Sequence, residues 1–257
     1  MNQSSAEILP KSIAQTTIVT AFITNVNNID FRSYDTYMEF GNKLLRLNVP
    51  TVMFVEQYMY DKHYKDNLDM YPQTQFIIFE RHQNYLYEYL PLVTNYEVIS
   101  NNPKKDTIGY HFVQCHKTEW LRMAYEQNPF QTTNFTWVDF GIYHMIKNDD
   151  VLMQSIQQLS TRTCPKIRIA SCIDPRQPCY TDIYHEVVWF FAGSIIGGDG
   201  ESLVHFSKIM RETCIQIIQE KKHIMWEVNI WYLLYQNYAS LFDFYLCDHD
   251  VSIIQNY

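Results

Sequence analysis

NFTWVDFG, residues 134–141, is the stretch that most clearly indicates the fold. It is an apolar run that ends in a carboxylate, Asp139, and a residue without a side chain, Gly141, follows two positions later. The run is typical of a buried strand, whereas Asp is a poor strand residue. The strand is therefore predicted to end at Asp139, where the polar side chain needs a structural or functional reason.

Further strands and helices alternate on both sides of this stretch. The alternation predicts an α/β domain with a mostly parallel central sheet and helices on both faces. In such open sheets, ligands bind beyond the carboxyl ends of the strands, here the 24–28 loop, the Asp139 turn and the loop after Ile196. The other expected strands are 16–24, 51–56, 74–80, 166–172, 186–196 and 241–248, and the expected helices are 34–47, a Tyr-rich one after residue 80, 110–127, 142–160, 201–221 and 225–238.

Composition excludes several classes of protein. The 257 residues carry 20 Lys and Arg against 28 Asp and Glu, a net charge of −8, which argues against a nucleic-acid binder. No apolar run approaches the roughly 20 residues that span a bilayer, and the polar start is unlike a signal peptide. Six scattered cysteines without a C-x-x-C pair suit a reducing compartment. We expect one cytoplasmic domain over 1–257, with 1–15 as a loosely ordered extension.

Asp139 has two interpretations. A Mg²⁺ or Mn²⁺ ion typically takes one or two carboxylates and completes its shell with diphosphate oxygens and water. Alternatively, Asp139 caps a helix that begins near Ile142. The Asp-Phe-Gly letters also occur in protein kinases, but the glycine-rich loop and the His-Arg-Asp loop of a kinase are both missing.

Three other segments are candidates for chemistry. Four of the seven glycines lie between 193 and 200, which indicates a tight turn before a helix or a turn that also holds a sugar. Glu227 lies near a helix start between two Trp residues. It either stabilises the helix N-terminus with its negative charge or acts as a catalytic base. Asp248, His249 and Asp250 form either an ordinary surface loop or a metal-binding one.

Together these motifs resemble the HtrL/YibB family from about residue 17 to about 250, and the resemblance implies a glycosyltransferase. The resemblance is strongest over N-P-F and W-V-D-F-G-I. It implies a GT-A-type fold, a single Rossmann-like α/β domain that binds a nucleotide-diphospho-sugar. The residues that carry it are Arg32, Tyr37, Phe40, Pro50, Phe54, Lys117, Asn128-Pro129-Phe130, residues 137–142, Gly197-Gly198 and Trp226-Glu227.

The resemblance also implies roles for single residues. Asp139 matches the first carboxylate of the Asp-x-Asp metal motif of GT-A enzymes, and Gly141 stands in place of the second. Asp248 or His249 from the C-terminal loop is then expected to complete the site for Mn²⁺ or Mg²⁺, unless Lys or Arg neutralises the diphosphate instead. Glu227 matches the acidic residue that faces the acceptor, as the base if the enzyme inverts. The nucleotide and sugar are expected at Thr24, Asn25, Asn27, Lys117, Trp137, Gly141, Gly197 and Gly198.

The expected activity is transfer of a hexose from a UDP-sugar to a hydroxyl of a glycan or protein. The missing second carboxylate leaves an alternative, a non-catalytic nucleotide- or carbohydrate-binding protein on a degenerate GT-A fold. A metal-dependent phosphohydrolase needs more clustered carboxylates than the sequence contains. We expect no nucleic-acid partner and no membrane span, and exposed aromatic residues are compatible with a homodimer.

Overall fold

The fold is built on one seven-stranded sheet. The computed structural model describes residues 14–24, 33–100, 102–145 and 148–257. The expected N-terminal extension therefore lies almost wholly outside the described residues. The strands are β1 (Thr16–Phe22), β2 (Thr51–Val55), β3 (Thr74–Ile78), β4 (Asn134–Val138), β5 (Ile167–Ser171), β6 (Phe191–Asp199) and β7 (Phe242–Leu246).

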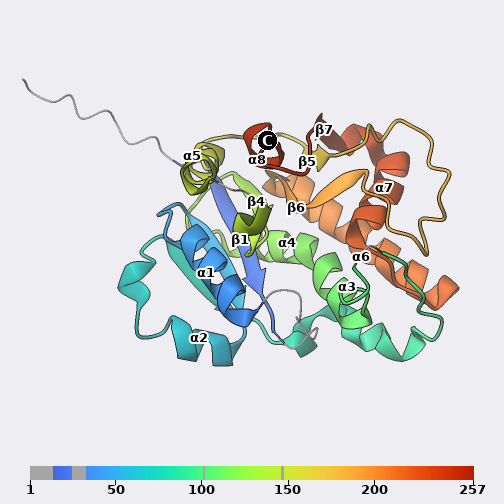
Figure 1. Cartoon of the computed structure of the whole chain (residues 1–257), viewed down its shortest axis with the longest axis horizontal. Helices are drawn as coiled ribbons and strands as arrows, with labels where there is room; N and C mark the ends of the chain where they lie inside the picture. Colours follow the sequence, from blue (N-terminus) through green and yellow to red (C-terminus); the bar gives the residue numbers. More distant parts are fainter. Residues whose placement is uncertain (1–13, 25–32, 101, 146–147) are drawn as a thin grey trace, which may run out of the picture.

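The strand order is β3-β2-β1-β4-β6-β5-β7, with β1 and β4 at the centre (Figure 1). Six strands run parallel, and β6 runs antiparallel to its neighbours β4 and β5. This confirms the expected α/β class with a mostly parallel sheet. The expected strand at 186–196 begins five residues later and continues to Asp199, so the glycine-rich segment is strand rather than turn.

Helices connect the strands, largely where the apolar periodicity predicts them. Two expected helices are each divided: 110–127 breaks at His116, and 142–160 becomes a 3₁₀ turn followed by a helix. The Tyr-rich segment is 3₁₀ rather than α, and it contains Pro91, which lacks an N–H. The α-helices are α1 (Tyr34–Leu45), α2 (Gln57–His63), α3 (Ile108–Cys115), α4 (Lys117–Gln127), α5 (Asp149–Leu159), α6 (Gly200–Lys221), α7 (Glu227–Tyr238) and α8 (Ser252–Gln255), and the 3₁₀ turns are Leu68–Met70, Arg81–Gln83, Tyr85–Leu92, Ile142–Met145 and Ala239–Leu241.

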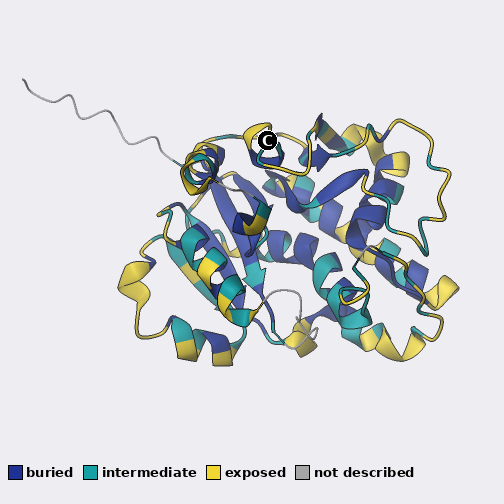
Figure 2. Ribbon diagram, viewed as in Figure 1, coloured by how far each residue is buried: buried dark blue, intermediate teal, exposed yellow. Residues whose placement is uncertain are grey.

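Both faces of the sheet are buried, as Figure 2 shows by the dark blue of the central strands. Successive side chains of a strand point to opposite faces. Phe135 and Trp137 of β4 accordingly pack in the cluster with α4, α6 and α7, and Val138 packs in the cluster with α1 and α5. In the described part of the chain, no helix has the length and apolar character needed to cross a bilayer.

Phe140 fixes α1 against the central strands. Its ring stacks on Phe22 of β1 at a centroid distance of 4.9 Å. On its other side lies Gly41 of α1, where an added Cβ would come within 1.9 Å of the ring carbon Cζ of Phe140. Gly41 is therefore required by the close approach of the aromatic ring, and the residue next to Asp139 is held between two secondary-structure elements.

We expect Gly41→Ala to lower the free energy of unfolding by about 1–3 kcal/mol, because overpacking displaces Phe140. Helix propensity alone predicts the opposite sign, a gain of about 1 kcal/mol. Urea unfolding followed by tryptophan fluorescence measures the change. Adding Phe140→Leu should reduce the cost of the alanine, and a stabilising Gly41→Ala would contradict this packing.

Candidate functional site

The carboxyl ends of β1 and β4 form the topological switch point of the sheet. From β1 the chain continues through β2 and β3 on one side, and β4 lies on the other side. Open α/β sheets bind ligands at such a point. Thr24 follows β1 and Asp139 follows β4, so both expected site residues lie at this edge. The backbone N–H and the hydroxyl of Thr24 both donate to Glu56 Oε2 at the end of β2, the N–H at 2.7 Å.

Two regular spacings bring Asp139 to Lys117. Trp137 and Asp139 are two residues apart at the end of β4, so their side chains point to the face that carries α4. Lys117 and Trp120 are three residues apart on α4 and share one face of that helix. The two indole rings stack at a centroid distance of 5.5 Å, and Lys117 Nζ lies 3.1 Å from Asp139 Oδ1.

The Lys117 ammonium is buried and saturated. Its side chain is 2% exposed, and Nζ lies 3.0 Å from Glu227 Oε1 and donates to the carbonyl of Gly193 at 2.8 Å. With Asp139 this makes three acceptors for the three donors of an ammonium group. The Nζ atom of Lys117 therefore links α4 to three other parts of the chain. These are the exit of β4, strand β6 and helix α7.

Gly193 provides the space for this cluster. A Cβ at this position would lie 2.5 Å from Glu227 Oε1. The backbone of β6 therefore approaches the carboxylate as closely as only glycine permits. Its neighbour Ser194 accepts a hydrogen bond from the Asp139 N–H at 3.0 Å, which fixes the backbone of the exit residue as well.

The charges of the cluster are coupled. Burial by itself lowers the pKa of Lys117, but Asp139 and Glu227 outweigh it, so the pKa is raised and Lys117 stays charged. Burial raises the pKa of Glu227, which Lys117 opposes and Asp139 reinforces. Glu227 Oε2 is buried with no hydrogen-bond partner among the described residues. One ammonium thus serves two carboxylates, and only Asp139, with a side chain 33% exposed, reaches solvent.

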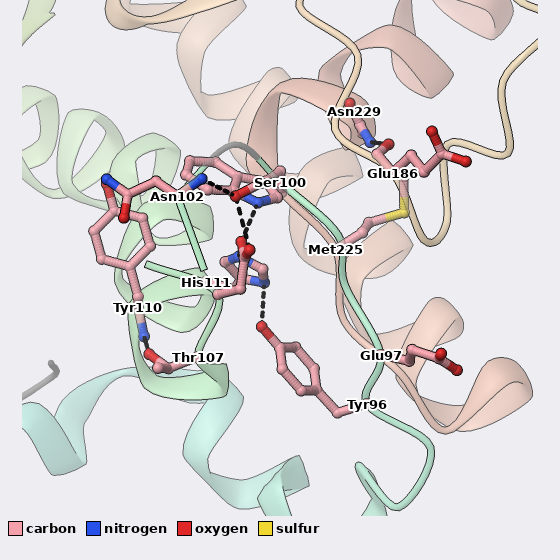
Figure 3. Close-up of polar contacts among 12 residues, drawn as sticks. Tyr96, Glu97, Ser100, Asn102, Thr107, Tyr110, His111, Glu186, Met225 and Asn229 are labelled. Carbon is pink, nitrogen blue, oxygen red and sulfur yellow. Dashed lines mark hydrogen bonds and ion pairs between the residues drawn. The ribbon is translucent and has the colours of Figure 1, made fainter. Parts of the chain in front are cut away.

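A polar network fixes the start of α7 beside Glu227. The indole N–H of Trp226 donates to Asp106 Oδ1 at 3.0 Å, and the Ser100 hydroxyl donates to Asp106 Oδ2 at 2.7 Å. Figure 3 shows Ser100 above His111, whose Nδ1 faces the hydroxyl of Tyr96 at 3.4 Å. Burial lowers the pKa of His111 to about 3, so it is neutral near pH 7. The network positions the residue that precedes Glu227.

In this structure, two residues of the cluster have surroundings that do not fit the roles predicted for them. Lys117 was expected to contact a phosphate, but its three donors are occupied within the protein. Glu227 was expected to face an acceptor, but its side chain is 2% exposed and lies behind Lys117. Both residues position Asp139 instead. Asp139 Oδ1 accepts from Trp137 Nε1 at 2.6 Å and pairs with Lys117 rather than capping the next helix.

The two predicted glycine contacts lie away from the switch point. Gly197 and Gly198 pair with Thr136 and Phe135 inside the sheet, toward the opposite edge from Asp139. A Cβ at Gly197 would meet the Tyr257 hydroxyl at 2.3 Å, and one at Gly198 would meet the Lys166 carbonyl at 2.5 Å. Close packing therefore accounts for both glycines, and the expected sugar-binding turn does not form there.

The predicted pairing of Asp139 with the C-terminal loop is not formed in this structure. Asp248 and His249 follow β7, and β6 and β5 separate that strand from β4. At about 4.8 Å per strand, the two sites are about 14 Å apart, too far to share an ion. His249 is exposed, and the N–H of Asp248 donates to the Ser252 hydroxyl.

The other predicted site residues are Trp137, Gly141, Asn25 and Asn27. Trp137 is buried against Trp120, and it reaches the cluster through its indole N–H and through its ring, whose centroid lies 5.7 Å from Lys117 Nζ. Gly141 is buried, and its carbonyl accepts from His144. Asn25 and Asn27 lie outside the described residues. Sequence reasoning missed Glu56 and Gly193, although Glu56, a carboxylate at the exit of a strand, carries the same signal as Asp139.

The residues around Asp139 fit a divalent cation only if other ligands of the ion come with the substrate. Within the described ranges, no group of three His, Cys, Asp or Glu side chains is arranged to hold a metal ion. Asp139 Oδ1 is occupied, whereas Oδ2 has no hydrogen-bond partner among the described residues. Because Mg²⁺ often takes one carboxylate together with substrate phosphates and water, the site fits a cation that arrives with a diphosphate. The described residues do not by themselves build a metal site.

A family model covers most of this site. The model for HtrL_YibB, described as a bacterial protein of unknown function, matches residues 94–250. The chain belongs to the HtrL_YibB family. The match includes Lys117, Asp139 and Glu227, whereas Thr24 and Glu56 precede it. Family membership confirms the resemblance derived from the sequence motifs.

Comparison with solved structures finds remote similarities. The chain is similar to mouse xyloside xylosyltransferase 1 in its apo form, with a TM-score of 0.44, 9% identity and coverage of 90% of this chain and 84% of that one. It is also similar to 4-diphosphocytidyl-2C-methyl-D-erythritol synthase from Anaerococcus prevotii, with a TM-score of 0.42, 9% identity and coverage of 90% and 86%. No curated protein matches the sequence.

Removing the shared cation tests the cluster directly. We expect Lys117→Met to lower the free energy of unfolding at pH 7 by about 3–5 kcal/mol, because Glu227 is left buried without a partner. Glu227→Gln in the same chain should recover part of the loss. Lys43→Met, which removes a surface pair with Asp149, is the matched control and should cost less than about 1 kcal/mol. Equal losses for the two lysine variants would contradict the cluster.

His116, next to Lys117, predicts a pH dependence of stability. It is buried with neither ring nitrogen partnered among the described residues, and burial lowers its pKa to about 3 from an ordinary 6.5. Between these values the unfolded chain binds more protons, so stability falls as the pH falls below 6.5. We expect His116 to account for about 2 kcal/mol of the loss between pH 7 and pH 5.

Urea unfolding at the two pH values measures this effect. The variant His116→Phe should show a smaller loss of stability than the wild type on going from pH 7 to pH 5. His249→Phe, in the exposed loop after β7, is the matched control and should leave the slope unchanged. An identical slope in all three proteins would contradict the assignment to His116.

Proposed function

We propose that this protein is a glycosyltransferase that binds a nucleotide-diphospho-sugar between the carboxyl ends of β1 and β4. It transfers the hexose to a hydroxyl of a glycan or protein, with UDP as the nucleotide and Mn²⁺ or Mg²⁺ as the cation. The observation that carries the proposal is the position of Asp139. It is the partly exposed member of a buried charge cluster at the switch point of the sheet.

The charge at this edge favours a diphosphate that comes with a cation. The sequence contains no glycine-rich phosphate loop, and the exits of β2, β3 and β4 carry Glu56, Glu80 and Asp139. Lys117 is saturated by protein acceptors and does not offset these carboxylates toward solvent. Within the described residues, these carboxylates favour a diphosphate that comes with a divalent cation, which Asp139 would hold through Oδ2.

The ribose is proposed to lie beside Glu56. Glu56 Oε2 accepts hydrogen bonds from the N–H and the hydroxyl of Thr24, while Glu56 Oε1 has no hydrogen-bond partner among the described residues. A carboxylate at the end of β2 is well placed to accept from a ribose hydroxyl, as in other nucleotide-binding α/β sheets. Glu56 would then orient the nucleoside while Asp139 orients the phosphates.

The chemistry of transfer depends on how the leaving group is stabilised. Negative charge develops on the departing diphosphate, and a bound divalent cation supplies Lewis-acid stabilisation of that charge. The contribution of this chain is to hold Asp139 in one orientation. Lys117 and Trp137 occupy Oδ1, so Oδ2 is directed to the ligand side. Glu227 keeps Lys117 in place and, because it is buried, is not proposed as the base.

One observation favours the alternative of a non-catalytic nucleotide- or carbohydrate-binding protein. The carboxylate expected to act as the base is buried, and no second carboxylate follows Asp139 in the motif. Release of UDP from UDP-hexoses separates the two functions. A transferase should hydrolyse its own donor slowly without an acceptor, whereas a binding protein should leave it intact.

Binding is tested by calorimetric titration of UDP with and without Mn²⁺. We expect Mn²⁺ to strengthen UDP binding at least tenfold, and Asp139→Asn to abolish that gain, because the substitution removes the ionised oxygen that faces the cation. Asp66→Asn, at an exposed position away from this edge, is the matched control and should bind as the wild type does.

The thermal melting curve of each variant shows whether it is folded. Equal UDP binding by the wild type and Asp139→Asn, both with and without Mn²⁺, would contradict the proposed site.

A further inference from the structure

Two cysteines face each other at the ends of the neighbouring parallel strands β5 and β7. The last paired residues of these strands are Ser171 and Leu246, and the next N–H along β7, that of Cys247, donates to the Ser171 carbonyl at 3.0 Å. That hydrogen bond belongs to the Ser171–Leu246 pair, the last step of the ladder. Cys172 and Cys247 are the next residues after the two strands, side by side just beyond it.

This register suits a disulfide. Neighbouring strands lie about 4.8 Å apart, and side chains at the same step of a parallel ladder point to the same face. Disulfides join Cα atoms that are about 4.4–6.8 Å apart. Both side chains pack against the same buried cluster, and their interaction lowers the pKa of Cys172 and raises that of Cys247. The carboxylate of Asp248 directly follows Cys247 in the chain and disfavours its thiolate, so Cys172 is taken as the attacking thiol.

The pair is accessible from a cavity. Cys172 and Cys247 are half-buried and line a cavity of about 590 Å³. Asp174, Gln177 and Ser252 contribute polar groups to the same walls. A small hydrophilic molecule can therefore enter and reach the sulfur atoms without unfolding of the sheet.

A second thiol pair provides an internal comparison. Cys115 and Cys214 also lie in one buried cluster, but both residues are 0% exposed in the core. Burial raises the pKa of Cys115, so its thiol is protonated as well as inaccessible. Proximity alone therefore does not distinguish the two pairs. Access from the cavity does, and only Cys172 and Cys247 have it.

We propose that Cys172 and Cys247 are a reversible dithiol–disulfide site that reacts with low-molecular-weight disulfides. The Cys172 thiolate attacks one sulfur of the small disulfide, forms a mixed disulfide and releases the first thiolate. Cys247, as its thiolate, then attacks Cys172 Sγ and releases the second. Two protein thiols are oxidised to one disulfide, and the small disulfide is reduced to two thiols. The new bond joins the end of β5 to the loop after β7 at the cavity wall.

The test is incubation of the reduced full-length protein with oxidised glutathione, followed by intact mass and peptide mapping. We expect a loss of two hydrogens, no retained glutathione, and a Cys172–Cys247 cross-linked peptide. The variant Cys247→Ser should instead accumulate one glutathione on Cys172, because the resolving thiol is missing. Cys172→Ser should react at least tenfold more slowly than the wild type.

Cys179→Ser is the matched control, because Cys179 is also half-buried and lies seven residues from Cys172 in the chain. It should form the same disulfide at the wild-type rate. Stable glutathione adducts on the wild type, a cross-link that includes Cys179 or Cys115, or no reaction would each overturn the proposal. The outcome does not depend on whether the protein transfers sugars.

Discussion

The buried ammonium of Lys117 is the constraint on which the rest of the site depends. A charge without water must be matched by acceptors, and here the carboxylates of Asp139 and Glu227 and the carbonyl of Gly193 supply them. The acceptors come from the exit of β4, from α7 and from β6. Four parts of the chain that lie far apart in sequence must therefore be in register before Lys117 is satisfied. The cluster therefore fixes the positions of these four parts of the chain at the carboxyl edge of the sheet.

Much of the fold follows from periodicity. The strand exits at Phe22, Val55 and Val138 lie within a few residues of where apolar runs end in polar residues. The direction of β6 does not follow, because an antiparallel strand and a parallel one have the same apolar pattern when both faces are buried. Its glycines also misled the prediction. They fit packing against Tyr257 and Lys166 rather than a turn, which only tertiary contacts reveal.

The sequence predicts which residues form the candidate site, but it does not predict what each residue does there. Asp139, Trp137 and Glu227 were singled out from local patterns and Lys117 from the family resemblance, and the fold brings all four together. Their roles depend on burial, which the local pattern does not encode. Lys117 lies on the sheet side of α4 and Glu227 in the first turn of a buried helix, so both are directed inward. The distance from Asp139 to Asp248 depends on the strand order, which the sequence leaves open.

Lys117 and Glu227 are buried, whereas the Asp139 side chain is partly exposed to solvent. This difference decides which of the three residues a ligand can contact. Lys117, which Glu227 holds in place, binds Asp139 at Oδ1, while Oδ2 has no hydrogen-bond partner among the described residues. Rigid first contacts of this kind reduce the reorganisation that a charged ligand requires on binding. The same arrangement explains why a lysine next to a proposed diphosphate site does not itself bind the phosphate.

A crystal structure with UDP and Mn²⁺ tests the central claim most directly, through the anomalous signal of the metal. The account predicts a manganese peak bonded to Asp139 Oδ2 and to the diphosphate, with Lys117 Nζ still bound to Glu227 and Gly193. A peak at the 248–250 loop, or phosphate oxygens bonded to Lys117 in place of its protein partners, would contradict it.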